Sequence, residues 1–437
     1  MTKHKFSSRW AFIIACVGSA VGMANVWGFP YKLGTNGGGA FLLIYVFFVA
    51  LFSYVGLSAE YAIGRRAKTG TLGSYEYAWK SRGLGAIGKV IGWLPLAGSM
   101  CIAVGYAVII AYVLKALVQA IDGSLMSENT DTWFNSFALT PYSVVPYHCI
   151  IVAGTLLTLF LGAKSIEKTN KIMMPLFFVL FAILAIRVAT LQGAAGGYAF
   201  LFGADFTKLA DPMVWISAMG QAFFSLSITG SGMIVYGAYL SKDEDIVSAA
   251  KNTALFDTLA AMVAALVMIP AVFAYGMDPA VGPKLLFVTL PKILQDMAGG
   301  RIFAVILFTA VIFGGISSLQ NMFEVVAESL MHKFPRLSRA FTLALLCAIC
   351  LGAGLGMEAI SSWGPWMDFV SIYIIPIGAV IGAISWFWVI KRNEILDEIN
   401  LGAERVRGKL WYDIGRFVYV PLALLLCIIA LSMHISF

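Results

Sequence analysis

The sequence predicts an all-α polytopic membrane protein with about eleven transmembrane helices. Of its 437 residues, 60% are hydrophobic and only 12% are charged, whereas a soluble globular protein carries roughly 25% charged residues. One membrane span requires about 20 apolar residues, so a chain of this length has room for about ten to twelve spans. Because a chain in hydrocarbon must satisfy its own backbone hydrogen bonds, these spans are predicted to be helices.

Apolar runs separated by polar residues, glycine or proline mark the predicted spans in chain order. The eleven segments are 10–31, 40–63, 88–121, 142–162, 165–187, 212–240, 247–276, 300–332, 338–356, 364–390 and 412–434. We expect them to form a single domain over residues 1–437.

The distribution of lysine and arginine predicts the orientation in the membrane. With the N-terminus in the cytoplasm, 23 of the 30 basic residues fall on the cytoplasmic side, which is the bias expected of an inner or plasma membrane protein. An eleven-span count then places the C-terminus outside the cell. The net charge of +7 therefore reflects topology and contact with the lipid bilayer, and it gives no reason to expect a nucleic acid partner.

Two predicted spans contain clusters of small and polar residues near their centres. Residues 18–30 of the first span read GSAVGMANVWGFP, and residues 224–232 of the sixth read FSLSITGSG. Glycine, serine and asparagine weaken a helix and free backbone groups, which are tolerated at membrane depth only against protein or a wet cavity. Close helix packing through small residues is the alternative interpretation.

The spacing of these two spans favours a central binding site. The first span opens one set of five spans (about 10–187), and the sixth opens another (about 212–390). Because five is odd, the second set is inverted relative to the first, and interrupted helices at matching places in inverted repeats indicate a transporter site. Freed N–H groups attract a carboxylate and freed carbonyls attract a cation. Asn25, Ser225, Ser317 and Ser318 offer further oxygen ligands for sodium.

Among the acidic residues within predicted spans, three are informative. Asp257 falls early in the seventh span, where a carboxylate is a functional candidate by default; a capped residue near the inner interface is the alternative. Glu324 and Glu328 are one helical turn apart in the eighth span. We expect these two glutamates to form a solvated face of the inner vestibule.

Several motifs resemble the neurotransmitter:sodium symporter family, on its bacterial amino-acid branch. In chain order they are GSAVG at 18–22, NVWGFPY at 25–31, NGGGAF at 36–41, QAFFSLS at 221–227 and the serine pair 317–318. The resemblance covers nearly the whole chain. It implies a transporter with five-plus-five inverted repeats, spans one and six broken at mid-membrane, and an extra span at 412–434.

The resemblance also implies a substrate site and two sodium sites. The substrate residues are Ala20, Gly22, Met23, Ile102, Tyr106, Phe224, Ser225, Ser227, Ile228, Gly230, Ser318 and Met322. The first sodium site comprises the Ala20 carbonyl, Asn25, Ser225, Asp257 and the substrate carboxylate. The second comprises the carbonyls of Gly18, Val21 and Gly314 with the hydroxyls of Ser317 and Ser318. The gate residues are Tyr106, Phe224, Asp368 and Tyr239.

The sequence departs from the family pattern at five informative positions. Gly28 replaces the arginine of the outer gate, although its acidic partner is retained as Asp368. Gly230 replaces a bulky aromatic residue, which predicts a pocket for a large substrate. Asp257 replaces an asparagine and predicts chloride independence, or alternatively proton exchange. Lys3 and Phe6 replace the arginine and tryptophan of the inner gate, where Tyr239 could still contribute.

The predicted function is sodium-coupled import of a large hydrophobic or aromatic L-amino acid, such as tyrosine, tryptophan or leucine, by alternating access. A proton-coupled or exchange-type carrier of the same fold is the alternative. An enzyme is not expected, because the predicted spans contain no His/Asp cluster, Ser/Lys dyad or paired carboxylates facing one cavity.

Overall fold

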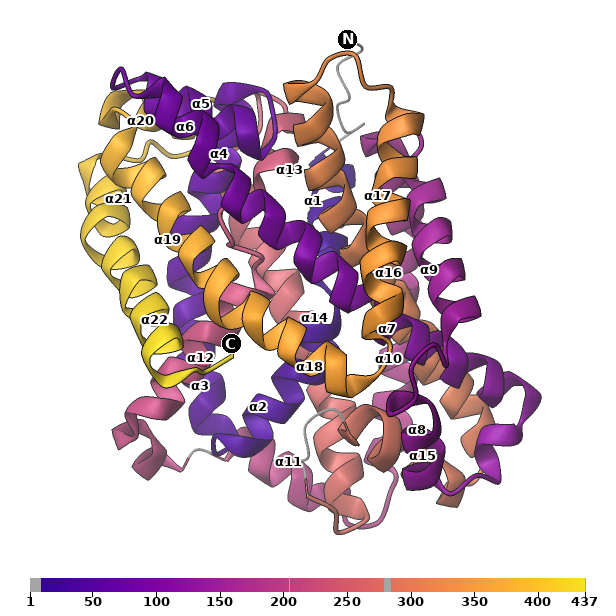
Figure 1. Ribbon diagram of the computed structural model, residues 1–437. Coiled ribbons are helices and arrows are strands. Elements are labelled where there is room, and N and C mark those ends of the chain that lie inside the picture. The colour runs from indigo at the N-terminus through magenta and orange to yellow at the C-terminus, as the bar shows by residue number, and fades with distance from the viewer. Residues whose placement is uncertain (1–8, 204, 279–283, 437) are drawn as a thin grey trace.

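A computed structural model describes residues 9–203, 205–278 and 284–436, and its architecture is a bundle of helices (Figure 1). In these ranges, eight helices are long and apolar enough to cross a membrane. They are Gly39–Ala67, Gly85–Asp122, Ala163–Ala189, Ile246–Ala274, Gly300–Lys333, Arg339–Met357, Ile360–Val389 and Lys409–Met433. The chain is thus an all-helical protein with the predicted apolar character.

The remaining predicted segments correspond to shorter or interrupted helices. The first is α1 (Arg9–Ala20) followed by Ala24–Thr35, which includes α2 (Phe29–Thr35), with a bend of 58° between the two parts. The fourth is α9 (Val145–Thr158). The sixth consists of α12 (Pro212–Ser225) and α13 (Ile234–Tyr239), with non-helical chain between them. The total of eleven spans and their inverted repeat stay predictions.

Several of the eight long helices carry more than one label in Figure 1, because short irregular turns divide them. Gly39–Ala67 contains α3 (Gly39–Phe52) and α4 (Ser58–Ala67), and Gly85–Asp122 contains α6 (Gly85–Ile91) and α7 (Trp93–Asp122). The others include α10 (Ala163–Ala189), α14 (Ile246–Ala274), α16 (Gly300–Lys333), α17 (Arg339–Gly354), α18 (Ile360–Phe369), α19 (Ile375–Ile384), α21 (Lys409–Ile414) and α22 (Val420–Met433).

The short helices occupy the two ends of the bundle. At one end lie α5 (Thr71–Lys80), α6 and α20 (Arg392–Asn400). At the opposite end lie α8 (Thr130–Ala138), α11 (Ala194–Phe202) and α15 (Leu290–Asp296) (Figure 1). The connections predicted for the cytoplasmic side therefore share one end, and those predicted for the outer side share the other.

The interrupted helices lie in the interior of the bundle. Helix α1 packs against α10, α14 and α16, and α13 packs against α4. The latter contact depends on glycine: a Cβ added to Gly64 would lie 2.0 Å from the carbonyl oxygen of Ile234, and one added to Gly237 would lie 2.4 Å from that of Tyr61. Close approach of the backbones thus fixes α13 against α4, as small residues commonly permit in membranes.

Arg65 at the end of α4 joins three segments at the predicted cytoplasmic end. Its guanidinium donates to the Glu398 carboxylate at 2.6 Å and to the backbone carbonyls of Glu398 and Leu401. It also donates to the carbonyls of Ser241 and Glu244 at 3.1 and 2.7 Å. One buried side chain thereby fastens α4 both to the connection after α13 and to α20.

The prediction of a solvated glutamate face in the eighth span is wrong for Glu324. This side chain is fully buried on α16 and forms an ion pair with Arg339, the first residue of α17. Tyr239 also donates to it at 2.6 Å. Glu328 is only half-buried and accepts the Gly70 N–H. A buried carboxylate requires such partners, and the arginine that supplies the charge lies outside the eighth span.

Candidate functional site

The interruption of the first span exposes two backbone N–H groups to side chains. Regular helical bonding ends near Val21, whose N–H donates to the carbonyl of Val17. The Gly22 N–H then donates to Asn25 Oδ1 at 3.0 Å, and the Met23 N–H donates to the Tyr106 hydroxyl at 2.8 Å. Side chains thus replace the carbonyls that an unbroken helix would provide.

The interruption of the sixth span is stabilised by Glu60, which the sequence analysis did not single out. This carboxylate is buried on α4 and accepts the N–H groups of Gly230 and Met233 at 2.9 and 3.1 Å. Tyr75 donates to the Gly230 carbonyl at 2.9 Å. A lone carboxylate inside the apolar run 40–63 was the signal that could have identified this role.

Three residues proposed for the first sodium site lie in direct contact. Asn25 Nδ2 donates to Asp257 Oδ1 at 2.7 Å and to the Asp257 carbonyl at 3.0 Å. The Ser225 hydroxyl donates to Asp257 Oδ2 at 2.6 Å. All three side chains are fully buried. Asp257 is therefore an interior residue joining both interrupted helices to α14, and the alternative of an interface cap does not fit its burial.

The five groups proposed for the second sodium site also converge. Ser317 on α16 donates to the Gly18 carbonyl at 2.6 Å and to that of Gly314 at 3.0 Å. Ser318 donates to the Val21 carbonyl at 3.0 Å. The result is a cluster of oxygen atoms from α1, its interruption and α16.

Both clusters have the chemistry that a hard cation requires. Carboxylate, amide, hydroxyl and carbonyl oxygens are the ligands that such ions prefer, and the hydrogen bonds recorded for these groups include no lysine or arginine. The residues therefore fit a cation at either position. The carbonyl of Ala20 has no recorded bond to the first cluster, although Ala20 borders the cavity described next.

A cavity of about 50 Å³ lies beside the interruptions of both spans, with Ser318 of the second cluster in its wall. Eight of the twelve predicted substrate residues line it: Ala20, Gly22, Ile102, Tyr106, Phe224, Ser227, Ser318 and Met322. Ser19, Ala24, Ser99, Thr229, Gly232, Asn321 and Val325, which were not predicted, complete the lining. One water requires roughly 10–15 Å³ on this measure, so the cavity holds a few waters and must enlarge to admit an amino acid.

The other four predicted substrate residues lie outside this lining. The Met23 N–H donates to the hydroxyl of Tyr106, which lines the cavity. Ser225 belongs to the Asp257 cluster. Ile228 lines a separate crevice bordered by α12, α19 and α22.

Gly230 corrects the interpretation based on pocket size. Its φ is +77°, and an added Cβ would meet the Gly378 carbonyl at 2.4 Å and the Tyr75 hydroxyl at 2.7 Å. The missing side chain therefore permits the approach of α19 and a left-handed backbone conformation. It does not enlarge the cavity.

The structure separates the predicted outer-gate residues. Asp368 on α18 is exposed, and no ion pair involving it is recorded in the ranges that the structure describes. Near Gly28, Trp27 instead stacks on Trp363 at a centroid distance of 6.4 Å, and Trp363 donates to the Gly105 carbonyl. This aromatic contact, which sequence spacing could not reveal, joins the second half of the first span to α18 and α7.

The predicted inner-gate residues are described only in part. Lys3 and Phe6 lie outside the described residues. Tyr239 contacts Glu324, which pairs with Arg339, so the tyrosine belongs to a buried polar cluster joining α13, α16 and α17.

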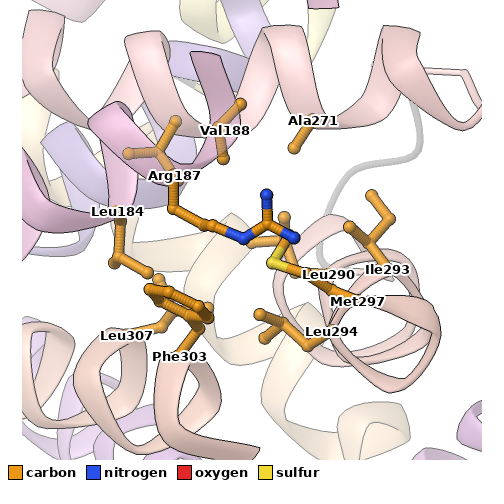
Figure 2. A pocket seen from close by; sticks show the side chains of 11 residues that line it. Leu184, Arg187, Val188, Ala271, Leu290, Ile293, Leu294, Met297, Phe303 and Leu307 are labelled. Carbon is orange, nitrogen blue, oxygen red and sulfur yellow. The ribbon is translucent and has the colours of Figure 1, made fainter. Parts of the chain in front are cut away.

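Another pocket lies apart from these clusters, between α10, α14, α15 and α16 (Figure 2). Its lining is apolar except for Arg187, whose side chain extends among Leu290, Met297 and Phe303. Arg187 is held there by a hydrogen bond to Thr190 at 2.7 Å and by a cation–π contact with Phe303 at 5.8 Å. The lining of this pocket contains none of the predicted site residues.

Several known proteins are similar to this chain over most of its length. The model of the sodium:neurotransmitter symporter family matches residues 3–144 and 143–436. The uncharacterized sodium-dependent transporter YhdH of Bacillus subtilis is 31% identical over 99% of this chain and 98% of its own. The human sodium- and chloride-dependent neutral and basic amino acid transporter B(0+) is 24% identical over 97% of this chain and 78% of its own.

A solved structure is similar over its full length. The crystal structure of MhsT in complex with L-phenylalanine has 35% sequence identity and a TM-score of 0.87, and the match covers 98% of this chain and 99% of that chain.

Proposed function

Because this chain belongs to the sodium:neurotransmitter symporter family, we propose that it imports a large hydrophobic or aromatic L-amino acid together with sodium. The family consists of sodium-dependent membrane transporters and not of enzymes, and the apolar helices of this chain agree with a multi-pass membrane protein. The N-terminus lies in the cytoplasm and the C-terminus outside the cell in this proposal, following the bias of the basic residues.

The observation that carries the proposal is the contact of Asn25, Ser225 and Asp257 beside the interruptions of both helices. The cluster adjoins the cavity through Gly22, which lines the cavity and whose N–H donates to Asn25 Oδ1; Tyr106 lines the same cavity. A substrate carboxylate that contacts Tyr106 and the first sodium binds more tightly when sodium is present. By thermodynamic linkage, the substrate raises sodium affinity by the same factor.

The second sodium, between Gly18, Val21, Gly314, Ser317 and Ser318, has a different role. It joins α1 to α16 without touching the substrate. Its binding favours conformations in which these helices lie together, and its release permits them to separate. Sodium at this site therefore shifts the protein toward the conformations in which α1 and α16 lie together, and in this way it acts on the substrate site.

The cavity walls and the ligand of MhsT support the proposed substrate class. Ile102, Phe224, Met322 and Val325 contribute apolar side chains to a lining that also holds Gly22, Tyr106 and several serine and threonine residues. The similar protein MhsT was crystallised with L-phenylalanine. An apolar or aromatic side chain suits these walls, and the small size of the cavity requires movement of Phe224 or neighbouring helices on binding.

Asp257 supports independence from chloride. A fixed carboxylate supplies negative charge beside the first sodium, which a chloride ion would otherwise provide. The human relative is described as sodium- and chloride-dependent. Membership of the family therefore does not decide whether this chain needs chloride, and an experiment is required. An exchange-type or proton-coupled carrier is the second candidate, favoured by the presence of a buried carboxylate able to take up a proton.

The test of the proposal uses purified protein in liposomes and in detergent. Thermal unfolding with each of the twenty amino acids identifies the ligand, since a compound that binds only the folded state raises its apparent stability. Uptake of that ligand is then driven by a sodium gradient, with potassium as the control. Uptake that persists without sodium would reject symport and favour the second candidate.

A further inference from the structure

Asn170 on α10 carries a buried amide group without a hydrogen-bond partner. The residue is fully buried, and neither Nδ2 nor Oδ1 has a partner among the described residues. The large majority of buried side-chain polar atoms have a hydrogen-bond partner in native structures. An amide with both ends unpaired therefore calls for a ligand that the protein atoms do not supply.

The amide lies against a residue of the second candidate sodium site. A Cβ added to Gly18 would lie 2.6 Å from Asn170 Nδ2 and 3.0 Å from Oδ1. No side chain separates the two residues. The carbonyl of the same glycine accepts the Ser317 hydroxyl at 2.6 Å, and α1 packs against both α10 and α16. Asn170 therefore approaches this site from a third helix.

Nearby polar groups on α10 have other partners. Lys171 forms an ion pair with Glu167 at 2.6 Å, and Thr169 contacts Gln320 on α16. Asn170 is thus a neutral amide among groups already engaged. A side-chain amide oxygen is a suitable ligand for a hard cation and adds no fixed charge.

We propose that Asn170 Oδ1 is an additional ligand of the sodium ion bound between α1 and α16. This inference rests on the proposed function and extends its second sodium site to α10. Sodium then joins three helices, so its release also frees α10 from α1. A trapped water would satisfy the same amide, but it would leave sodium affinity independent of residue 170.

The experiment is a sodium titration of thermal stability without substrate, at constant ionic strength with potassium. Asn170→Leu removes both polar atoms while keeping a branched side chain, Asn170→Asp retains the oxygen ligand, and Asn170→Ala is a truncation that tests the same loss should the larger leucine fail to fold. Ser317→Ala marks loss of the second site. Thr71→Val, which removes another buried unpaired polar atom on α5, is the matched control.

The expected result has two parts. Asn170→Leu raises the sodium concentration for half-maximal stabilisation about tenfold, as loss of a metal-site partner commonly does, whereas Asn170→Asp and Thr71→Val do not. Without sodium, Asn170→Leu is at least as stable as the parent, because an unpaired buried amide has been removed. In a Ser317→Ala background the leucine substitution has no further effect on the sodium response.

Two outcomes would overturn the inference, and they are distinguishable. If the parent and Ser317→Ala behave as proposed but Asn170→Leu keeps the parental sodium response, only the role of Asn170 is rejected. If sodium does not stabilise the parent at all, the second sodium site and the proposed function fail with it.

Discussion

Asn25 and Asp257 lie 232 positions apart in the chain, and the Asn25 amide donates to the Asp257 carboxylate at 2.7 Å. The contact crosses from the interrupted first span to α14, with Ser225 of the sixth span on the other carboxylate oxygen. Three helices therefore meet at one buried negative charge. In the proposed mechanism, a sodium ion at this point offsets the charge of the carboxylate and is held by residues of all three helices.

Asp257→Asn tests whether the carboxylate replaces chloride. The substitution preserves shape but removes the fixed charge, so we expect sodium-driven uptake to fall at least tenfold in chloride-free buffer and to recover in part when chloride is added. Uptake is measured in liposomes with gluconate or chloride as the anion. If the variant takes up substrate at the parental rate both with and without chloride, the role assigned to Asp257 is contradicted.

Tyr106→Phe tests the carboxylate end of the substrate site. The hydroxyl accepts the Met23 N–H at 2.8 Å and faces the cavity, so its loss leaves a freed backbone group without its partner. The hydroxyl proton is also available to a substrate carboxylate, and a hydrogen bond to a charged group contributes about 1.5–3 kcal/mol. We therefore expect substrate affinity to fall by about tenfold or more. Stabilisation by sodium alone changes little. Equal losses of both responses would place the tyrosine in the scaffold instead.

The polar residues that the sequence singled out at membrane depth contact one another in the structure, whereas several residues that line the cavity were not anticipated. The role of the polar residues in binding sodium stays a prediction. Asn25, Ser225, Asp257 and Ser317 are polar residues at membrane depth, where sequence alone makes them unusual. The structure places them in two clusters of contacts. Glu60 was missed because its partners are backbone N–H groups, freed only when the sixth span is interrupted, and sequence does not show which N–H groups these are.

Two other positions show why backbone direction limits such prediction. Gly230 was assigned to the cavity from its place in the motif, but its left-handed conformation turns it toward Gly378. The acidic residue Asp368 was retained from the family pattern, yet the contact near Gly28 is the stack of Trp27 on Trp363. Both outcomes depend on how α18 and α19 lie against the interrupted spans, which no local pattern encodes.

Glu60→Gln tests the stabilisation of the sixth span. The carboxylate accepts two backbone N–H groups, and an amide in its place retains one acceptor while directing its NH₂ at the other N–H. We expect the free energy of unfolding to fall by about 1–3 kcal/mol and substrate binding to weaken. Thermal unfolding of Glu60→Gln is compared with that of Glu128→Gln, an exposed glutamate. Equal stability of the two variants would show that Glu60 is dispensable.

Arg65→Lys tests the connection between α4, the segment after α13, and α20. Lysine keeps the charge but cannot reproduce the five hydrogen bonds of the planar guanidinium. We expect lower thermal stability and faster proteolytic cleavage between residues 391 and 411. The neighbouring Arg66→Lys is the control: Arg66 is half-exposed, donates to Tyr77 and lies 3.8 Å from the Glu398 carboxylate, a long ion pair that lysine can retain. Cleavage at equal rates in both variants would argue against a fastening role for Arg65.

Gly22→Ala tests whether the substrate site and the second sodium site share one wall. An added Cβ would lie 2.3 Å from the Tyr106 hydroxyl and 2.4 Å from the Ser318 hydroxyl, so both side chains must move. We expect substrate binding and sodium stabilisation to weaken together, each by about tenfold or more for a cost near 1.4 kcal/mol. Gly154→Ala on α9 has open space around its Cβ and should raise stability slightly. Loss of only one response at residue 22 would mean that the two sites are structurally independent.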